Sequence, residues 1–287
     1  MNYPVYFNLE KIEDAKISIH DLGFSRGLAV FDFLRTYEKV PFELNEHLKR
    51  LDHSCRIVGL QNPLTHDQIK QIIDQILLEV DDDICIKIIV TGGENPVGIT
   101  PIKPLVITAA QKLIETAEEK KLLGIELDFG TIPRSFCSAK TLFYLPGISA
   151  LLKHKNSGKQ IDDILYVDET DAILESTTAN FFMVKNNTLI TPEKGVLEGI
   201  TRNVVLNIAK QEHIRLEIRP IHKHELEYGD EFFITSTTRE ILPIKRIENL
   251  HREVSCYTLT RFLQAKFRKY VEDASKNSKT DVLLPAL

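Results

Sequence analysis

Two segments near the start of the chain carry apolar side chains at the spacing of an amphipathic helix. One runs from a cap-like Asn45 to Gly59, and the other from Thr65 to Leu78. Their apolar positions are Leu48, Leu51, Cys55 and Val58 in the first and Ile69, Ile72, Ile73 and Ile76 in the second. Both segments are predicted to be helices with one buried face, and Arg50 lies on the first.

Short runs of branched and aromatic residues predict strands around these helices. Val30–Tyr37 ends at Glu-Lys-Val-Pro, which indicates a strand, a turn and a second strand. Further strands are expected at Ile84–Thr91 and Leu105–Ala109, separated by a glycine-containing loop. Residues 1–112 are therefore predicted to form a small α/β N-terminal domain, followed by a polar linker at 113–122.

The remainder of the chain is denser in short strands. Residues 123–275 are predicted to form a larger C-terminal domain with a β-barrel-like core, and residues 276–287 a loose tail. The expected strands are Gly124–Ile132, Ile164–Asp168, Asn180–Lys185, Thr188–Thr191 and Phe232–Thr235. The expected helices are Ile148–His154, Thr201–Glu212 and Ser255–Glu272. Asn186-Asn187 is typical of the turn of a hairpin. The fold class is α+β with two domains.

Composition excludes several classes of protein. The 287 residues are 43% hydrophobic and 27% charged, with a net charge of −5, which gives no general attraction to nucleic acid. The four cysteines lack the spacing of a zinc site or a disulfide framework, and His222-Lys-His224 is too sparse to bind a metal. No segment is typical of a leader or a membrane span, so a cytoplasmic, soluble protein without a metal is expected.

Lys140 is the first candidate for chemistry, in the stretch Ser138-Ala-Lys-Thr-Leu-Phe-Tyr-Leu-Pro146. Most lysines are solvated, but apolar neighbours could desolvate this amine, lower its pKa and favour the nucleophilic neutral form. Tyr144 follows four residues later, so a helical segment would bring its phenol beside the amine. The alternative for Tyr144 is a core aromatic residue.

Glu175 lies between an apolar pair and a strand, where a carboxylate requires a partner. A protonated pyridine nitrogen would be one such partner, and an ordinary ion pair is the alternative. Gly199-Ile200-Thr201 opens a predicted helix whose backbone N–H groups could bind an anion. Hydroxyl donors at Ser236, Thr237 and Thr238 and the Arg50 guanidinium could complete a phosphate site.

This ordered set of residues resembles the fold-type IV, class IV pyridoxal-phosphate enzymes, over residues 18 to about 245. That superfamily includes D-amino acid aminotransferases, branched-chain aminotransferases, (R)-amine transaminases and aminodeoxychorismate lyase. The resemblance implies that Lys140 holds pyridoxal 5'-phosphate as a Schiff base and moves the proton, while Glu175 pairs with the pyridine nitrogen. It implies further that Tyr144 lies near the cofactor's phenolic oxygen. Arg50, Ile200, Thr201, Ser236 and Thr237 are implied as cofactor-binding residues. A homodimer is also implied, with loops of the neighbouring first domain closing each site.

Substrate choice is expected to depend on Arg26, Phe31, Lys87 and Thr238. Arg26 could bind a substrate carboxylate across a dimer interface, although a surface arginine is the alternative. Phe31 stands where the best-known D-amino acid aminotransferases carry a tyrosine, and Lys87 where L-specific branched-chain enzymes carry an arginine. The combination of Arg26, Lys87, Val90-Thr-Gly-Gly93 and Lys140-Thr-Leu-Phe-Tyr144 resembles a less typical group of D-amino acid aminotransferases. This resemblance implies transamination of a D-amino acid with a 2-oxo acid such as 2-oxoglutarate. The alternatives are a branched-chain L-amino acid aminotransferase, the lyase, the amine transaminase and a non-catalytic cofactor-holding protein.

Overall fold

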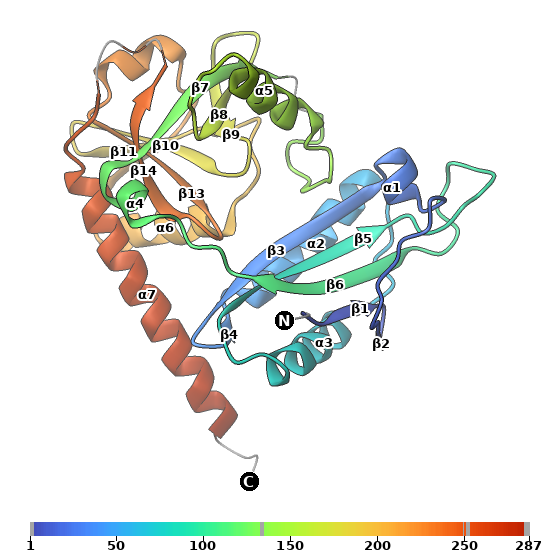
Figure 1. The fold of residues 1–287 in the computed structure, drawn as a ribbon. Coiled ribbons are helices and arrows are strands. Elements are labelled where there is room, and N and C mark those ends of the chain that lie inside the picture. Colours follow the sequence, from blue (N-terminus) through green and yellow to red (C-terminus); the bar gives the residue numbers. More distant parts are fainter. Residues whose placement is uncertain (1–2, 133–134, 249, 251–252, 284–287) are drawn as a thin grey trace. The chain divides into compact units, whose positions relative to one another are not determined.

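A computed structural model describes residues 3–132, 135–248, 250 and 253–283 of the chain (Figure 1). The chain divides into two compact units. The first unit comprises Met1–Ile114, Ser138–Phe143 and Val271–Leu287, and the second comprises Glu115–Cys137 and Tyr144–Tyr270. The short segment that contains Lys140 therefore belongs with the first unit, although the sequence placed it inside the second domain. Local sequence patterns cannot predict that a short segment such as Ser138–Phe143 packs with a unit formed mainly by residues much earlier in the chain.

The first unit is built on an antiparallel sheet of six strands in the order β2-β1-β6-β5-β3-β4. The strands are β1 (Val5–Phe7), β2 (Glu10–Lys11), β3 (Ala29–Tyr37), β4 (Val40–Pro41), β5 (Ile84–Thr91) and β6 (Leu105–Lys112). The strands expected in this part of the sequence are all present, and β1 and β2 were not expected. Both are too short to show a period.

Two helices pack against one face of this sheet, α2 (Leu44–Val58) and α3 (His66–Leu78) (Figure 1). The even-numbered isoleucines of β5, the α2 leucines and the α3 isoleucines share one buried cluster, as the two periodicities predicted. The N-cap of α2 is Glu43, so the expectation that Asn45 caps the helix was wrong by two residues. Thr65 caps α3 in a capping box. A short helix, α1 (Leu22–Arg26), was not expected.

The second unit contains an eight-stranded sheet in the order β12-β11-β10-β13-β14-β7-β8-β9. Because β9 also pairs with β10, the six strands from β10 to β9 close into a barrel, which confirms the barrel-like core. The strands of the whole sheet are β7 (Ile125–Thr131), β8 (Asp163–Val167), β9 (Ile173–Ser176), β10 (Asn180–Lys185), β11 (Thr188–Thr191), β12 (Arg215–Ile218), β13 (Glu231–Ser236) and β14 (Glu240–Ile247). The β10–β11 hairpin turns at Asn186 and Asn187, both with positive φ.

The helical segments of the second unit are α4 (Glu118–Leu123), α5 (Leu145–Asn156), α6 (Ile200–Gln211) and a 3₁₀ helix, η1 (Lys223–Tyr228). Helix α7 (Thr258–Leu283) begins in this unit and ends in the first. The loose tail expected from residue 276 is helical as far as Leu283, and 284–287 lie outside the described residues. Helix α4 occupies much of the expected linker.

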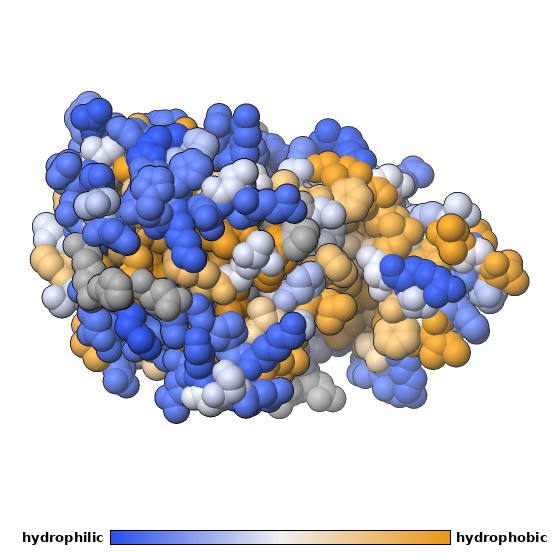
Figure 2. All heavy atoms as spheres, turned by 90° about the horizontal axis from the view of Figure 1, so that it is seen from above, coloured by the Kyte–Doolittle hydropathy of each residue, from blue (hydrophilic) through white to orange (hydrophobic). Residues whose placement is uncertain are grey.

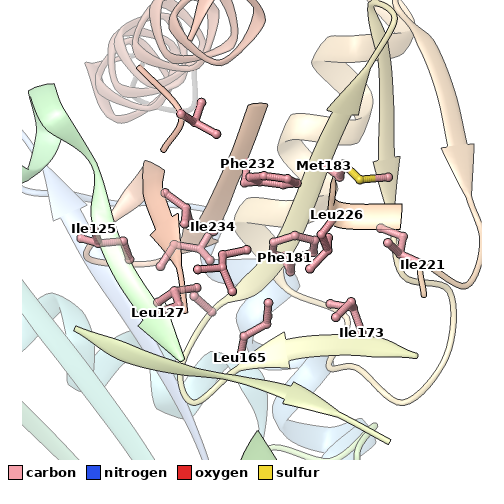
Figure 3. Close-up of a cluster of buried hydrophobic side chains, with 14 of the residues drawn as sticks. Ile125, Leu127, Leu165, Ile173, Phe181, Met183, Ile221, Leu226, Phe232 and Ile234 are labelled. Carbon is pink, nitrogen blue, oxygen red and sulfur yellow. The ribbon is translucent and has the colours of Figure 1, made fainter. Parts of the chain in front are cut away.

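The barrel interior is filled by apolar side chains from several strands (Figure 3). Phe181 stacks on Phe232, with ring centroids 6.0 Å apart. Ile125, Leu165 and Ile234 complete this side of the cluster and are at most 2% exposed. The packed interior holds fixed the strand ends from which the polar residues described below extend. Within the described part of the chain, no helix is long and apolar enough to cross a membrane.

Candidate active-site residues

Lys140 is held at the end of β3 by its backbone. The Phe31 N–H donates to the Lys140 carbonyl at 2.8 Å, and the Leu142 N–H donates to the Ala29 carbonyl at 3.3 Å. The Lys140 N–H in turn donates to Ser54 Oγ on α2 at 3.0 Å. The segment therefore pairs with β3 as an extended strand would. Its half-buried amine lies 4.8 Å from the centroid of the Phe31 ring.

The ring of Phe31 also lies under a second amine, that of Lys87 on β5. Lys87 Nζ is 4.8 Å from the ring centroid, the same distance as Lys140 Nζ. Phe31 and Lys87 point to the sheet face opposite α2, because Val30 and Ile88 point toward the helices. Burial lowers the pKa of Lys87 from its ordinary value. Two amines thus lie close to one aromatic ring.

Arg50 is fixed from the other face of the sheet by Asp32 and His47. Its Nε and Nη2 donate to Asp32 Oδ2 and Oδ1 at 2.9 and 2.8 Å, and His47 Nδ1 donates to Oδ1 at 2.6 Å. Asp32 is fully buried and the Arg50 side chain is 9% exposed. The bidentate contact occupies two of the five N–H groups of the guanidinium and sets its plane.

Burial and charge act in opposite directions in this cluster. Burial disfavours the Asp32 carboxylate, but Arg50 and His47 outweigh this effect and hold the pKa of Asp32 well below its ordinary value. For His47 burial is the largest influence and lowers the pKa, although Asp32 acts to raise it. The cluster is therefore built around an ionised carboxylate, and its electrostatics favour a neutral histidine at neutral pH.

In the second unit, Glu175 on β9 is 5% exposed and hydrogen-bonded to neutral donors. Asn180 Nδ2 donates to Glu175 Oε2 at 2.8 Å, and the Leu197 N–H donates to the same oxygen at 3.1 Å. Neutral donors orient a carboxylate without cancelling its charge. These two contacts set the orientation of the Glu175 carboxylate.

Helix α6 begins at Ile200 after its N-cap Gly199, and Ile200 and Thr201 lie in its first turn, as the sequence predicted to within one residue. Glycine provides no side-chain cap for the first N–H groups of the helix. Ser236 ends β13, and Thr237 and Thr238 lie in the turn that leads to β14. Their side chains are half-buried. These two segments provide backbone and hydroxyl donors of the kind that bind phosphate.

Tyr144 lies in a different setting from the one that the sequence predicted. Residues 140–144 are not helical, so the helical pairing of Lys140 with Tyr144 is wrong: Thr141 pairs with Val30, and Tyr144 is the N-cap of α5. Arg26 is exposed in the last turn of α1. Backbone pairing with β3 prevails over any helical tendency around Lys140, because it satisfies peptide groups at a buried strand end.

The donors present match the chemical groups of pyridoxal phosphate. Lys140 provides an amine for an aldehyde, Glu175 an oriented carboxylate for a pyridinium, and Arg50 a fixed guanidinium for a phosphate. Thr235, 2% exposed, has a buried hydroxyl without a hydrogen-bond partner among the described residues. A buried donor of this kind is normally satisfied, so the edge of β13 is consistent with a polar ligand.

Sequence reasoning did not single out Asp32, His47 or Asn180. Asp32 did leave a signal, because it occupies a helix-facing position of β3 at which the alternation predicts an apolar residue. His47 is one position from Leu48 on α2, and only the helix geometry brings it to Asp32. Asn180 gave no such signal, because asparagine is also common in turns that precede a strand.

Comparison with known proteins identifies one family. The model of the family described as Amino-transferase class IV matches residues 29–247. A Methanocaldococcus jannaschii protein named "Putative branched-chain-amino-acid aminotransferase" is 32% identical over 92% of this chain and 95% of its own. A Staphylococcus epidermidis D-alanine aminotransferase is 27% identical over 94% of this chain and 99% of its own. The structure of a branched-chain aminotransferase from Thermoproteus uzoniensis, solved with norvaline, superimposes with a TM-score of 0.86 at 25% identity, covering 94% of this chain and 95% of its own.

Proposed function

Because the chain belongs to the class IV aminotransferases, which use pyridoxal phosphate, we propose that it transfers the amino group of a D-amino acid to a 2-oxo acid such as 2-oxoglutarate. The observation that carries the proposal is the pair of amines over the ring of Phe31, Lys140 and Lys87. One amine serves the cofactor, and the other remains to attract a substrate carboxylate.

Each residue has a role that its contacts support. Lys140 would hold the aldehyde carbon of the cofactor, and Glu175 would keep the pyridine nitrogen protonated. Arg50 would donate to the phosphate, together with the first N–H groups of α6 at Ile200 and Thr201. Further donors to the cofactor would be the hydroxyls of Ser236, Thr237 and Tyr144. Thr238 would contact the substrate.

The bound cofactor supplies an acceptor for the amino group and a ring that withdraws electrons from the substrate Cα. Lys140 would then release the aldehyde to the incoming amine, take the proton from Cα, and return it to the C4' carbon of the cofactor. Glu175 would be kept in position through this transfer by its contacts with Asn180 and the Leu197 N–H. The second oxo acid would reverse these steps.

The choice of a D-amino acid is supported by Lys87 and Arg26 as carboxylate-binding cations. The Gly92–Thr100 loop contains no arginine or histidine and Phe31 stands where the best-known D-amino acid aminotransferases carry a tyrosine, so Lys87 and Arg26 would have to bind the carboxylate in their place. Curated relatives carry the names of both branched-chain and D-alanine enzymes, so a branched-chain L-amino acid aminotransferase is the second candidate. A homodimer in the cytoplasm is part of the proposal, because both are typical of the family.

The proposal is tested by the visible spectrum of the purified protein as four amino acids are added separately. D-alanine and D-glutamate are expected to remove the absorption of the lysine-bound cofactor, and L-leucine and L-glutamate are not. Loss with the L-amino acids alone would establish the branched-chain alternative. A spectrum that responds to none of the four would leave the amine transaminase or the lyase, and pyruvate release from aminodeoxychorismate would identify the latter.

Lys140→Ala separates catalysis from folding in the same experiment. We expect an unchanged far-ultraviolet circular dichroism spectrum and a loss of turnover of about 10²–10⁴-fold or more, because Lys140 is the amine assigned to take the proton from Cα and Lys87 is assigned to the substrate carboxylate. The matched control is Lys153→Ala, at an exposed lysine of α5, which should retain wild-type turnover. A Lys140→Ala protein with near-normal turnover would exclude the assignment.

A further inference from the structure

Glu175, Asn180 and Thr235 form a row across three neighbouring strands of the barrel. Asn180 on β10 is directly opposite Glu175 on β9 and directly opposite Thr235 on β13. Cross-strand partners point to the same face of a sheet, with Cβ atoms roughly 4.5–5.5 Å apart. The three side chains are 5%, 5% and 2% exposed. The Glu175 carboxylate is therefore buried and lies beside the Asn180 amide.

The Asn180 amide uses its N–H groups on two acceptors. One is Glu175 Oε2 at 2.8 Å, and the other is the Leu197 carbonyl, also at 2.8 Å. The Leu197 N–H returns to Glu175 Oε2 at 3.1 Å. Two donors on one carboxylate oxygen fix the plane of the carboxylate, and both donors depend on the position of Asn180.

The carbonyl oxygen of the same side chain contacts the start of α6. A Cβ at Gly199 would lie 1.9 Å from Asn180 Oδ1. The backbone of Gly199, with φ −69° and ψ 134°, is open to any residue, so the space taken by Asn180 is what requires glycine here. One buried asparagine thus packs against both Glu175 and the turn that presents the Ile200 and Thr201 N–H groups.

We propose that Asn180 is a positioning residue that holds the Glu175 carboxylate toward the pyridine nitrogen and fixes the Gly199 turn beneath the phosphate. The catalytic consequence rests on the proposed function. Without the amide, Glu175 loses a hydrogen-bond donor and the Leu197 carbonyl loses the donor that it accepts from. The carboxylate then rotates, and its hold on the proton of the ring nitrogen weakens.

The test uses protein loaded with pyridoxal phosphate that carries ¹⁵N at the ring nitrogen. The variants are Asn180→Ala and Asn180→Leu; the second has a side chain of similar size without donors. Asn207→Ala is the matched control, because Asn207 is exposed on α6. The ¹⁵N chemical shift is followed as a function of pH, and the dissociation constant of the cofactor is measured separately.

In both Asn180 variants the pH at which the ring nitrogen loses its proton is expected to fall by about one unit or more. Cofactor affinity is expected to fall roughly tenfold, and the control should match wild type. A general loss of packing would reduce affinity but would not move the ring titration. Wild-type titration and affinity in both Asn180 variants would overturn the inference. Wild-type protein that binds no cofactor would instead exclude the proposed function itself.

Discussion

At the scale of single residues, Lys87 shows how the surroundings of a charge decide what it can do. Lys87 is half-buried, its ammonium group lies over the ring of Phe31, and burial lowers its pKa. A partly desolvated cation binds a carboxylate more strongly than a surface lysine, because little water has to be displaced. Lysine lacks the planar fork of arginine, so it attracts the carboxylate as a point charge.

Lys87→Met is therefore expected to weaken the binding of the amino acid rather than that of the cofactor. Loss of a charged hydrogen bond of about 1.5–3 kcal/mol corresponds to a decrease of roughly 10- to 150-fold in kcat/KM, mainly through KM. Steady-state kinetics and a cofactor titration measure the two effects separately. Lys112→Met, at an exposed lysine of β6, is the control. Equal kinetics for the two variants would remove Lys87 from the substrate site.

At the scale of elements, the sequence predicted the helices and strands whose pattern lies within the segment itself. The helices α2 and α3, the strands β3 and β5 and the β10–β11 hairpin follow from apolar periodicity and turn residues within each segment. The barrel was predicted as a class of structure, but its closure by β9 and β10 depends on pairing between strands. Periodicity carries no information about such partners.

The residues of the candidate site likewise divide into those that the sequence identified and those that it did not. Lys140, Glu175 and the Gly199 turn were identifiable because their chemical types stand out in apolar or helix-opening surroundings. Asp32 and Asn180 were not, because each acts on another candidate through a contact that depends on how two elements pack or pair. The extended pairing of residues 140–142 with β3 was missed for the same reason.

Asp32 and His47 join β3 to α2 through a buried contact that depends on pH. Burial holds the pKa of His47 in the folded state below its value in the unfolded chain. The folded state therefore binds this proton less readily, so the contribution of His47 to stability is complete above the unfolded pKa of about 6.5. It is lost as the pH falls toward the folded pKa.

The urea concentration at the midpoint of wild-type unfolding should consequently decrease as the pH is lowered from about 7 to about 5. His47 contributes up to about 1.4 kcal/mol per pH unit to this dependence. His47→Gln keeps a donor for Asp32 but no titrating ring, and should flatten the dependence, as urea unfolding at several pH values would measure. His53→Gln, at an exposed histidine of α2, should keep the wild-type dependence. Identical pH profiles for wild type and His47→Gln would contradict this account.

At the scale of the whole molecule, the first unit exposes a group of large apolar side chains, and soluble monomers rarely expose such groups. They lie on the segment around α1 and on the β5–β6 loop, which are joined by backbone hydrogen bonds. Figure 2 shows apolar residues at the surface at the end of the view where Figure 1 places these elements. Their exposed fractions are 70% for Ile19, 72% for Phe24, 95% for Val97, 72% for Ile99 and 69% for Ile102.

We expect this apolar surface to form the contact of the proposed homodimer. In sedimentation equilibrium the wild type should have twice the mass of one chain, and Phe24→Asp combined with Val97→Asp should give monomers, because charges buried in the contact would be unpaired. Leu78→Asp is the control, since Leu78 is 86% exposed on α3, away from α1. A double variant that remains dimeric would place the contact elsewhere.

The same variant also tests the role of Arg26, which lies two residues from Phe24 on α1. If Arg26 binds the substrate carboxylate across the dimer contact, dissociation should raise KM for the amino acid even though no group of the chain's own cofactor site has changed. Arg26→Ala in the intact dimer should raise KM by a similar factor, and combining it with the monomeric variant should add little, because both remove one interaction. Additive effects would show that Arg26 acts within its own chain or not at all.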